Sequence, residues 1–206
     1  KLLIYQNDEF SGDIYCYISN HLPEKSFLIF NDTKVIKARI LFQKKTGAFI
    51  EIFCLEPYEK INDYAVVLSQ KKSTRWKCMI GGAGKWKEKF LEKEIELGGH
   101  RIILKAQLVE KLTDAYVVEL SWNPGDHSFA EIIDHAGEMP LPPYIKRKAE
   151  ASDAERYQSI YSHYEGSVAA PTAGLHFTKQ IFSSFKEKNI DTGFVNLHVG
   201  AATFKP

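Results

Sequence analysis

The chain has 206 residues, enough for one large domain or two small ones with a substantial core. Its content of 44% hydrophobic and 26% charged residues is typical of soluble globular proteins. Because 27 Lys and Arg residues balance 26 Asp and Glu residues, the composition excludes RNA binding through an overall positive field and leaves only a local basic patch.

Three cysteines, Cys16, Cys54 and Cys78, lie far apart, without a CxxC motif or a neighbouring histidine at metal-ligand spacing. We therefore expect reduced thiols, a cytoplasmic location and no bound metal. No apolar run reaches about 18 residues and no signal-like segment opens the chain, so we expect no membrane contact. The chain starts at Lys1 rather than at methionine and stops directly after an apolar strand, which predicts a fragment.

The first predicted element is a buried strand over residues 27–30 in "SFLIFNDT", which ends in a polar turn. From about Gly47 the pattern changes to short alternating runs, broken by "GGAGK" and "LGGH". Their spacing predicts a small antiparallel barrel or sandwich over residues 44–124. The runs expected to be strands are "GAFIEIFCL", "DYAVVLSQ", "TRWKCMIG", "HRIILKAQLV" and "DAYVVELSW".

Helical signals follow Trp122. Ser128 and Glu131 form a capping-box pair ahead of an apolar run, and Gly137 suits the helix end. A second capping-box pair, Ser152 and Glu155, predicts another helix, with one face formed by Tyr157, Ile160, Tyr161 and Tyr164.

A third helix is expected to begin with Thr178 as its N-cap, to bury Ile181, Phe182 and Phe185, and to end near Asn189. The stretch "FVNLHVG" then alternates as a strand, with Val195, Leu197 and Val199 on one face and Phe194, Asn196 and His198 on the other. Together the elements predict a mixed α/β main domain, residues 1–43 and 125–206, interrupted by the all-β insert at 44–124.

The stretch "GSVAAPTAGLHFT" is almost free of bulky side chains before the helix expected at Thr178. Small residues let a ligand approach the backbone, and free N–H groups at the helix start favour a carboxylate or phosphate. A tightly packed strand-to-helix connection would need the same residues. His176 lies just before this helix and His198 just before "VGAATF", so two strand ends each carry a histidine beside small residues, which favours a pocket.

The segment "GEMPLPPYIKR" places Tyr144, Lys146 and Arg147 directly after a proline-rich, extended stretch. A stiff crossover would look the same, but an aromatic and two cations at fixed positions suit stacking and phosphate contact on RNA. Among motifs with known mechanics, GxGxxG before a helix, the Walker loop, HExxH and GxSxG are absent from the sequence.

Four stretches, "FNDTKVIKARI", "GEMPLPPYIKR", "ERYQSIYSHYEGSVAAPTAGLHFT" and "LHVGAATFKP", resemble the S-adenosylmethionine:tRNA ribosyltransferase-isomerase family of queuosine biosynthesis. The resemblance implies an α/β domain with an inserted β-barrel. It also implies transfer and isomerisation of the ribosyl part of S-adenosylmethionine onto an aminomethyl-deazaguanine base at the wobble position of tRNA. Epoxyqueuosine tRNA, adenine and methionine would be the products, and a monomer is expected.

This chemistry needs a base beside the sulfonium, a group that helps adenine leave, and a pocket that excludes water. The resemblance makes His176 and His198 the candidates for proton transfer, with Asp32 as a third. S-adenosylmethionine would be bound, and consumed, by the small-residue loop and its neighbours, and the tRNA by four other residues. The expected S-adenosylmethionine-binding residues are Ala170, Pro171, Thr172, Ala173, Gly174, Tyr157, Gln158, Gly200 and Thr203; the expected tRNA-binding residues are Arg39, Tyr144, Lys146 and Arg147.

The sequence departs from the family pattern at Ala202, where glycine is usual before the threonine of "GTF", and at Lys37, where proline is usual. A methyl group at position 202 would obstruct a close ligand. Two other classes of function remain open. A non-catalytic RNA-binding module would bind RNA without regard to S-adenosylmethionine, and a small-molecule enzyme would act on the free deazaguanine base.

Overall fold

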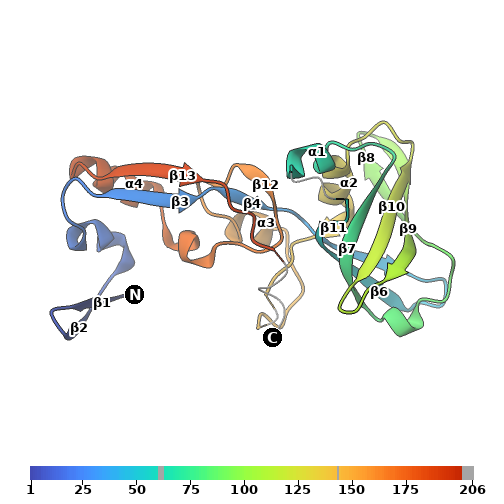
Figure 1. Ribbon diagram of the computed structural model, residues 1–206, viewed down its shortest axis with the longest axis horizontal. Helices are drawn as coiled ribbons and strands as arrows, with labels where there is room; N and C mark the ends of the chain where they lie inside the picture. Colours follow the sequence, from blue (N-terminus) through green and yellow to red (C-terminus); the bar gives the residue numbers. More distant parts are fainter. Residues whose placement is uncertain (60–62, 143, 201–206) are drawn as a thin grey trace.

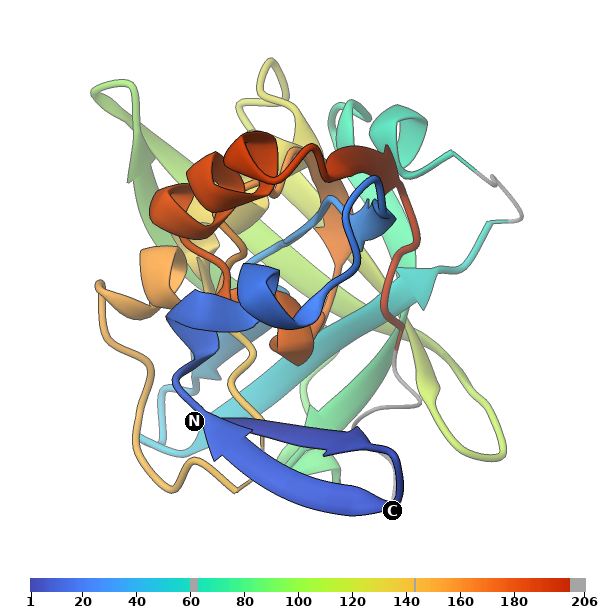
Figure 2. The same cartoon turned by 90° about the vertical axis from the view of Figure 1, so that its left-hand side faces the viewer.

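The computed structural model describes residues 1–59, 63–142 and 144–200. The molecule is elongated, with a large curled sheet at one end and a small hairpin at the other (Figure 1). The hairpin pairs β1 (Leu2–Gln6) with β2 (Glu9–Asp13) and is followed by the 3₁₀ helix η1 (Tyr15–His21). Figure 2 looks at the molecule from the hairpin end.

Seven strands form the curled sheet in the order β11-β5-β6-β7-β10-β9-β8, and each pair of neighbours is antiparallel. The strands are β5 (Arg39–Gln43), β6 (Phe49–Pro57), β7 (Ser73–Gly81), β8 (Leu91–Leu97), β9 (His100–Lys111), β10 (Tyr116–Asn123) and β11 (Gly137–Glu138), with the 3₁₀ helix η2 (Ala83–Lys85) between β7 and β8.

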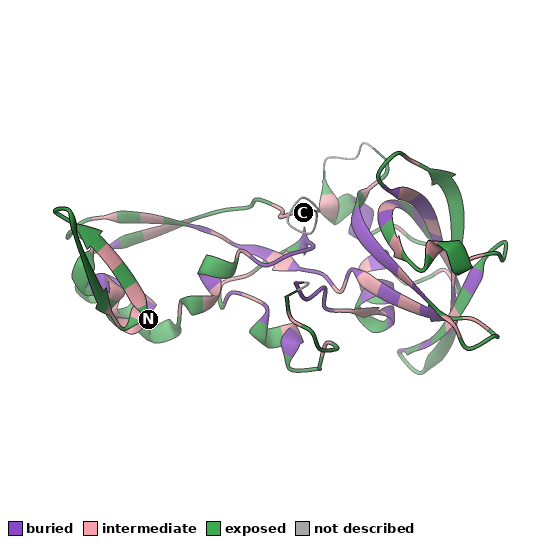
Figure 3. Ribbon diagram, turned by 90° about the horizontal axis from the view of Figure 1, so that it is seen from below, coloured by how far each residue is buried: buried purple, intermediate pink, exposed green. Residues whose placement is uncertain are grey.

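The main core lies inside this sheet, because alternate residues of its strands point to the concave side. Phe42, Ile52, Trp76, Leu104 and Leu120 are fully buried there. Figure 3 shows the contrast between these buried strands and the exposed hairpin at the far end.

The sheet curls until β5 and β8 contact each other. In the described part of the chain the hydrogen-bonded order nevertheless ends at β8 on one side and at β11 on the other. The mixed α/β class and the antiparallel strands are confirmed; the sheet itself is a half-barrel, and β5 belongs to it although it precedes residue 44.

One expected strand of the insert is a helix. "DYAVVLSQ" forms α1 (Tyr64–Leu68), because the Asp63 side chain accepts a hydrogen bond from the Ala65 N–H at 2.9 Å and caps the first turn. Only Val67 and Leu68 are buried. A short apolar run fits either a strand or a helix by its periodicity, and the cap selects the helix.

The helix α2 (Phe129–Ala136) begins and ends as predicted. Ser128 and Glu131 form both hydrogen bonds of the capping box, and the helix buries Phe129 and Ile132 against the sheet. Gly137 is needed for space rather than for a left-handed conformation. A Cβ at this position would lie 1.9 Å from the Lys37 carbonyl oxygen.

The helix predicted from Ser152 is wrong in length. It is the single turn α3 (Asp153–Arg156), and the Ser152 side chain forms no capping hydrogen bond. The Asp153 carboxylate binds Arg147, and the Gln158 amide bonds to both backbone groups of Val35 at 2.9 and 2.8 Å. These tertiary contacts turn the chain away from a helix, so the tyrosines do not share a helix face.

Two parallel strand pairs form the rest of the molecule. β13 (Asp191–Val195) pairs with β3 (Phe27–Asn31), and β12 (Tyr164–Ser167) pairs with β4 (Thr33–Val35). The helix α4 (Lys179–Glu187) starts at Thr178 as predicted, and it buries Ile181 and Phe185 against Phe30. The 3₁₀ helix η3 (Thr172–His176) precedes it.

Two expectations about these strands are corrected. β3 is a strand, but Phe27 and Ile29 are 63% and 64% exposed, because in the described part of the chain this sheet consists of β3 and β13 alone. The strand expected over 194–199 ends at Val195, and Leu197 is exposed. Beyond Val195 the Asn31 side chain bonds to the N–H and the carbonyl of Leu197, replacing a strand ladder.

The three cysteines are free thiols. None of the helices in residues 1–59, 63–142 and 144–200 is long and apolar enough to cross a membrane.

Candidate functional site

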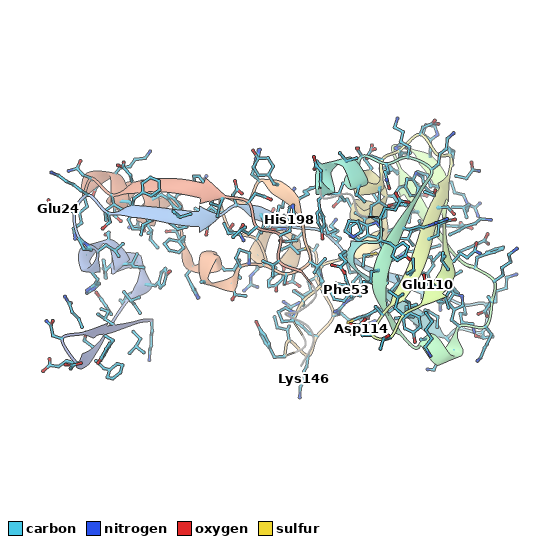
Figure 4. The ribbon with its side chains drawn as sticks, viewed as in Figure 1. Glu24, Phe53, Glu110, Asp114, Lys146 and His198 are labelled. Atoms are coloured by element: carbon cyan, nitrogen blue, oxygen red, sulfur yellow. The ribbon has the colours of Figure 1, made fainter. Side chains whose placement is uncertain are left out.

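His198 lies at the junction between the paired parallel strands and the curled sheet (Figure 4). It lines a cavity of about 490 Å³, here called the His198 cavity, to which several separate segments contribute. The other described lining residues are Asp63, Ala65, Leu68, Ser69, Ser128, Ala130, His163, Tyr164, Glu165 and Asn196.

A chain of hydrogen bonds from buried hydroxyls holds the His198 ring. Its Nδ1 lies 3.0 Å from Thr33 Oγ1, which in turn lies 2.7 Å from Ser167 Oγ. Ser167 Oγ accepts a hydrogen bond from the Val199 N–H at 2.8 Å. Thr33 and Ser167 are almost completely buried, so β4 and β12 present the two hydroxyls to His198 without competition from water.

These hydrogen bonds engage one edge of the His198 ring. Ser167 accepts from the Val199 N–H, and the Ser167 and Thr33 hydroxyls share a hydrogen bond in which either can be the donor. A neutral ring satisfies the bond to Thr33 in either tautomer, because Nδ1 can accept the Thr33 proton or Nδ1–H can donate to Thr33 Oγ1. Nε2 has no hydrogen-bond partner among the described residues.

Burial favours the same neutral ring. Desolvation lowers the pKa of His198, and the nearby Asp63 carboxylate opposes this only in part. The Tyr64 ring covers the imidazole at a centroid distance of 4.5 Å. Asp63 and Tyr64 belong to the cap and first turn of α1, so the segment between β6 and β7 supplies one wall of the site.

Gly166 allows the approach of the His198 ring to β12. Its φ is +151°, and a Cβ added there would lie 2.5 Å from His198 Cε1 and 2.7 Å from Nδ1. Any side chain at this position would displace the ring or strain the backbone.

Asp32 lies beside the same junction and is 9% exposed. Its Oδ1 accepts a hydrogen bond from the Asn196 amide at 3.4 Å, and its backbone carbonyl accepts from the His163 N–H at 2.7 Å. Asn196 lines the His198 cavity, whereas Asp32 is not among the described residues that line it.

His176 has different neighbours. It is exposed at the end of η3, and its ring packs on Tyr15 of η1 at a centroid distance of 5.1 Å. It is not among the described residues that line the His198 cavity. The two predicted histidines therefore lie on different elements with different aromatic partners.

The small-residue loop is used partly for packing. Ala170 is buried, and its N–H donates to the Tyr157 hydroxyl, whose pKa burial raises. Gly174 is buried under Tyr161, since a Cβ there would lie 2.5 Å from the tyrosine oxygen. Thr172 and Ala173 are exposed, and Pro171 is half-buried.

The remaining residues expected to bind S-adenosylmethionine lie elsewhere. Both polar atoms of the Gln158 amide bond to the Val35 backbone, but the residue still lines a cavity of about 220 Å³ beside β4. Gly200 is exposed, two residues beyond His198. Thr203 lies outside the described residues, as does Ala202.

The predicted tRNA-binding residues do come together. Arg39 of β5 lines a cavity of about 690 Å³, the basic cavity, with Lys146 and Arg147 from more than 100 positions along the chain. Its described lining also includes Leu41, Phe49, Glu51, Glu138, Met139, Leu141, Pro142, Ile145, Lys148 and Ala149. Tyr144 is 73% exposed on the same segment, and Figure 4 shows Lys146 at the edge of the molecule below the junction.

Two of these cations have protein partners. Arg147 binds the Asp153 carboxylate through both terminal nitrogens, at 2.6 and 2.7 Å, and this holds the pKa of Asp153 well below its usual range. Arg39 lies over the Phe53 ring and 3.4 Å from Glu51. Its Nε is buried without a hydrogen-bond partner among the described residues. The guanidinium group is therefore held in place, but its Nε–H donor is left without an acceptor.

The cavity beside β4 is a neighbour of the two larger ones. It shares Ala130 and Glu165 with the His198 cavity and Met139 with the basic cavity.

Four residues of the site, Thr33, Ser167, Asp63 and Tyr64, were not predicted from the sequence. Thr33 and Ser167 stand in the stretches "FNDTKVIKARI" and "EGSVAAPTAG", where a buried hydroxyl beside a strand end was the available signal. Asp63 and Tyr64 gave no such signal, because their segment was expected to be a strand. Within the described residues no group of His, Cys, Asp and Glu could hold a metal ion.

Comparison with known proteins gives the site a context. The family model described as queuosine biosynthesis protein matches residues 1–206. Proteins named S-adenosylmethionine:tRNA ribosyltransferase-isomerase are 35% identical in Caldanaerobacter subterraneus subsp. tengcongensis and 38% identical in Rickettsia bellii strain OSU 85-389. Both alignments cover 100% of this chain, and 54% and 56% of the relatives.

A crystal structure of S-adenosylmethionine tRNA ribosyltransferase from Thermotoga maritima is 21% identical, with a TM-score of 0.28, and the match covers 96% of this chain and 50% of that one. The chain spans about half the length of the relatives it matches. The match to the family model over all 206 residues, together with relatives above one-third identity, shows that the chain belongs to the queuosine biosynthesis protein family.

Proposed function

We propose that this chain carries the S-adenosylmethionine site of a tRNA ribosyltransferase-isomerase. The reaction transfers and isomerises the ribosyl moiety of S-adenosylmethionine onto the aminomethyl-deazaguanine base at the wobble position of tRNA. Its products are epoxyqueuosine tRNA, adenine and methionine. The observation that carries the proposal is the His198 cavity, in which a hydroxyl-bound imidazole meets carboxylates and an aromatic wall.

The lining of the His198 cavity suits S-adenosylmethionine. Asp63 and Glu165 supply negative charge for a sulfonium or ammonium group, and Ala65, Leu68 and Ala130 supply apolar surface. The volume of about 490 Å³ lies within the usual range for small-molecule sites. The predicted contribution of residues 170–174 would come from the exposed Thr172 and Ala173 of η3.

The proposed role of His198 follows from its hydrogen bonds. Because Nδ1 is engaged by Thr33, Nε2 is the nitrogen that would meet the substrate, and as Nε2–H it would stabilise negative charge on the departing adenine. Asp32 would be the proton acceptor, because its carboxylate is largely buried and bonds to Asn196, which lines the cavity. For His176 we retain the predicted part in proton transfer, which would require the substrate to reach η3.

The basic cavity would bind the tRNA. Arg39 and Lys146 supply positive charge for phosphates, while Leu41 and Met139 supply an apolar floor for a base. Tyr144 is exposed and available for stacking. The shared lining residues would allow a wobble nucleotide bound there to approach the His198 cavity.

Four further expectations remain part of this proposal: the division into a main domain at 1–43 and 125–206 and an insert at 44–124, closure of the half-barrel into an inserted barrel domain, a monomeric state, and location in the cytoplasm, where the tRNA partner would be found.

The test is adenine release from S-adenosylmethionine by the full-length product of the gene, with and without tRNA that carries the aminomethyl-deazaguanine base. Release that depends on the modified tRNA, with a matching mass gain on that tRNA, supports the proposal. Release with the free base alone would favour a small-molecule enzyme. Retained tRNA binding without adenine release would favour a non-catalytic RNA-binding module.

A further inference from the structure

A second group of cations lies at the end of the curled sheet, where the β5–β6 loop meets the segment between η2 and β8. A cavity of about 480 Å³ opens there. Its described lining is Gln43, Lys44, Lys45, Glu88, Lys89, Phe90, Leu91 and Glu92. With the neighbouring Lys85, Lys87 and Lys105 we call the lysines of this region the lysine cluster.

Lys44 joins the two segments. Its side chain is 10% exposed, donates to the Lys85 carbonyl at 2.6 Å and pairs with Glu88 at 2.9 Å. The hydrogen bond from Lys44 also lowers the pKa of Glu88. The largely buried Lys44 side chain therefore fixes the two segments, and the other lysines that they carry, relative to each other.

Four lysines of the cluster are free to bind a ligand. Lys45, Lys85, Lys87 and Lys89 are exposed and form no ion pair within the described part of the chain. Glu88 is engaged by Lys44, and Glu92 by Lys105 at 2.9 Å. The carboxylates at this end are thus neutralised, and a positive excess remains on the surface.

An aromatic side chain lies among these charges. Phe90 is 41% exposed, and the Lys105 ammonium lies 4.8 Å from its ring centroid. An exposed ring beside unpaired lysines is typical of surfaces that bind single-stranded nucleic acid, where bases stack and phosphates pair with cations.

The lysine cluster is continuous with the basic cavity along the outer face of β5. Arg39, Leu41 and Gln43 lie on that face, because they occupy every second position of the strand. Arg39 and Leu41 line the basic cavity, and Gln43 lines the cavity of the cluster. Gln43 is also the strand partner of Phe49, which lines the basic cavity.

We propose that the lysine cluster is a second tRNA-binding surface, which binds the phosphate backbone of an RNA whose target nucleotide occupies the basic cavity. The proposal rests on the proposed function for the identity of the RNA. Binding at two separated points would orient the RNA along β5.

The test measures binding of fluorescently labelled, unmodified tRNA by anisotropy, at several salt concentrations and without S-adenosylmethionine. The variant Lys45→Gln/Lys89→Gln is compared with Lys179→Gln/Lys186→Gln, which removes the same charge from the exposed surface of α4. We expect the first variant to bind roughly fivefold to thirtyfold more weakly. Its plot of log K against log salt should be shallower by roughly 1.5 to 2, and the control should match the wild type.

Equal affinities and salt slopes for the two variants would overturn the proposal. A second variant, Phe90→Ala, should weaken binding without changing the salt slope, because stacking releases no counterions. Since the assay needs no turnover, weaker binding by Lys45→Gln/Lys89→Gln would support the surface even if the wild type released no adenine.

Discussion

Replacing Gly166 with alanine tests the construction of the site. The added Cβ would lie 2.5 Å from Cε1 of His198 and 2.9 Å from its Nε2. A side chain at a φ of +151° costs about 1–3 kcal/mol. Moving the ring also breaks the bond to Thr33, which contributes about 1 kcal/mol. We expect a total loss of about 2–4 kcal/mol.

Two measurements follow this change. Thermal unfolding should show a midpoint lower by roughly 4–16 °C, from about 2–4 °C per kcal/mol in a chain of this size. Adenine release should fall by about 100-fold or more, because a displacement near 1 Å of a catalytic group has effects of that order.

The control separates backbone strain from the clash. Gly47 has a φ of +83° and no atom within 4 Å of an added Cβ, so Gly47→Ala imposes strain without displacing His198. Gly166→Ala in a His198→Ala background should cost little more than Gly47→Ala. If Gly166→Ala and Gly47→Ala release adenine at the same rate, the proposed positioning of His198 is refuted.

Three further outcomes are expected. Thr33→Val should lower the free energy of unfolding in urea by about 1–3 kcal/mol by leaving the Ser167 hydroxyl without its hydrogen-bond partner Thr33, whereas Thr33→Ser should restore most of it. Because burial lowers the pKa of His198, stability should fall as the pH drops from about 6.5 toward the folded-state pKa, and His198→Ala should remove that part of the pH dependence. Ser128→Ala should cost about 1 kcal/mol by uncapping α2. Since the Glu131 pKa is lowered to about 2, the stability that this group contributes above pH 4.5 should be lost between about pH 4.5 and 2, and Ser128→Ala should weaken this loss.

Local signals predicted the elements whose determinants are close in sequence. The capping box at Ser128 and the N-cap at Thr178 specify α2 and α4, because a cap and an apolar stripe need only neighbouring residues. The alternating runs correctly predicted strands of the curled sheet for the same reason, because alternation is also a pattern among neighbouring residues. "DYAVVLSQ" failed because five residues are too few for their period to separate helix from strand.

Contacts outside the helical pattern account for the other errors. The helix expected from Ser152 stops after one turn, where Gln158 binds the backbone of β4, and its Asp153 carboxylate binds Arg147 in the preceding loop. A periodic pattern carries no information about either partner.

The sequence by itself determined the family, the mixed α/β class, the candidate histidines and the basic residues, because these depend on residue type and local order. Only the tertiary structure decided which of them meet. Ser167 and His198 lie 134 and 165 positions from Thr33, and both bond to it; parallel pairing of β12 with β4 brings Ser167 there, whereas His176 is held on Tyr15 instead. The pairing of distant strands depends on burial and register across the whole chain, so the hydrogen-bond partners of His198, and with them the proposed role, can be read only from the folded molecule.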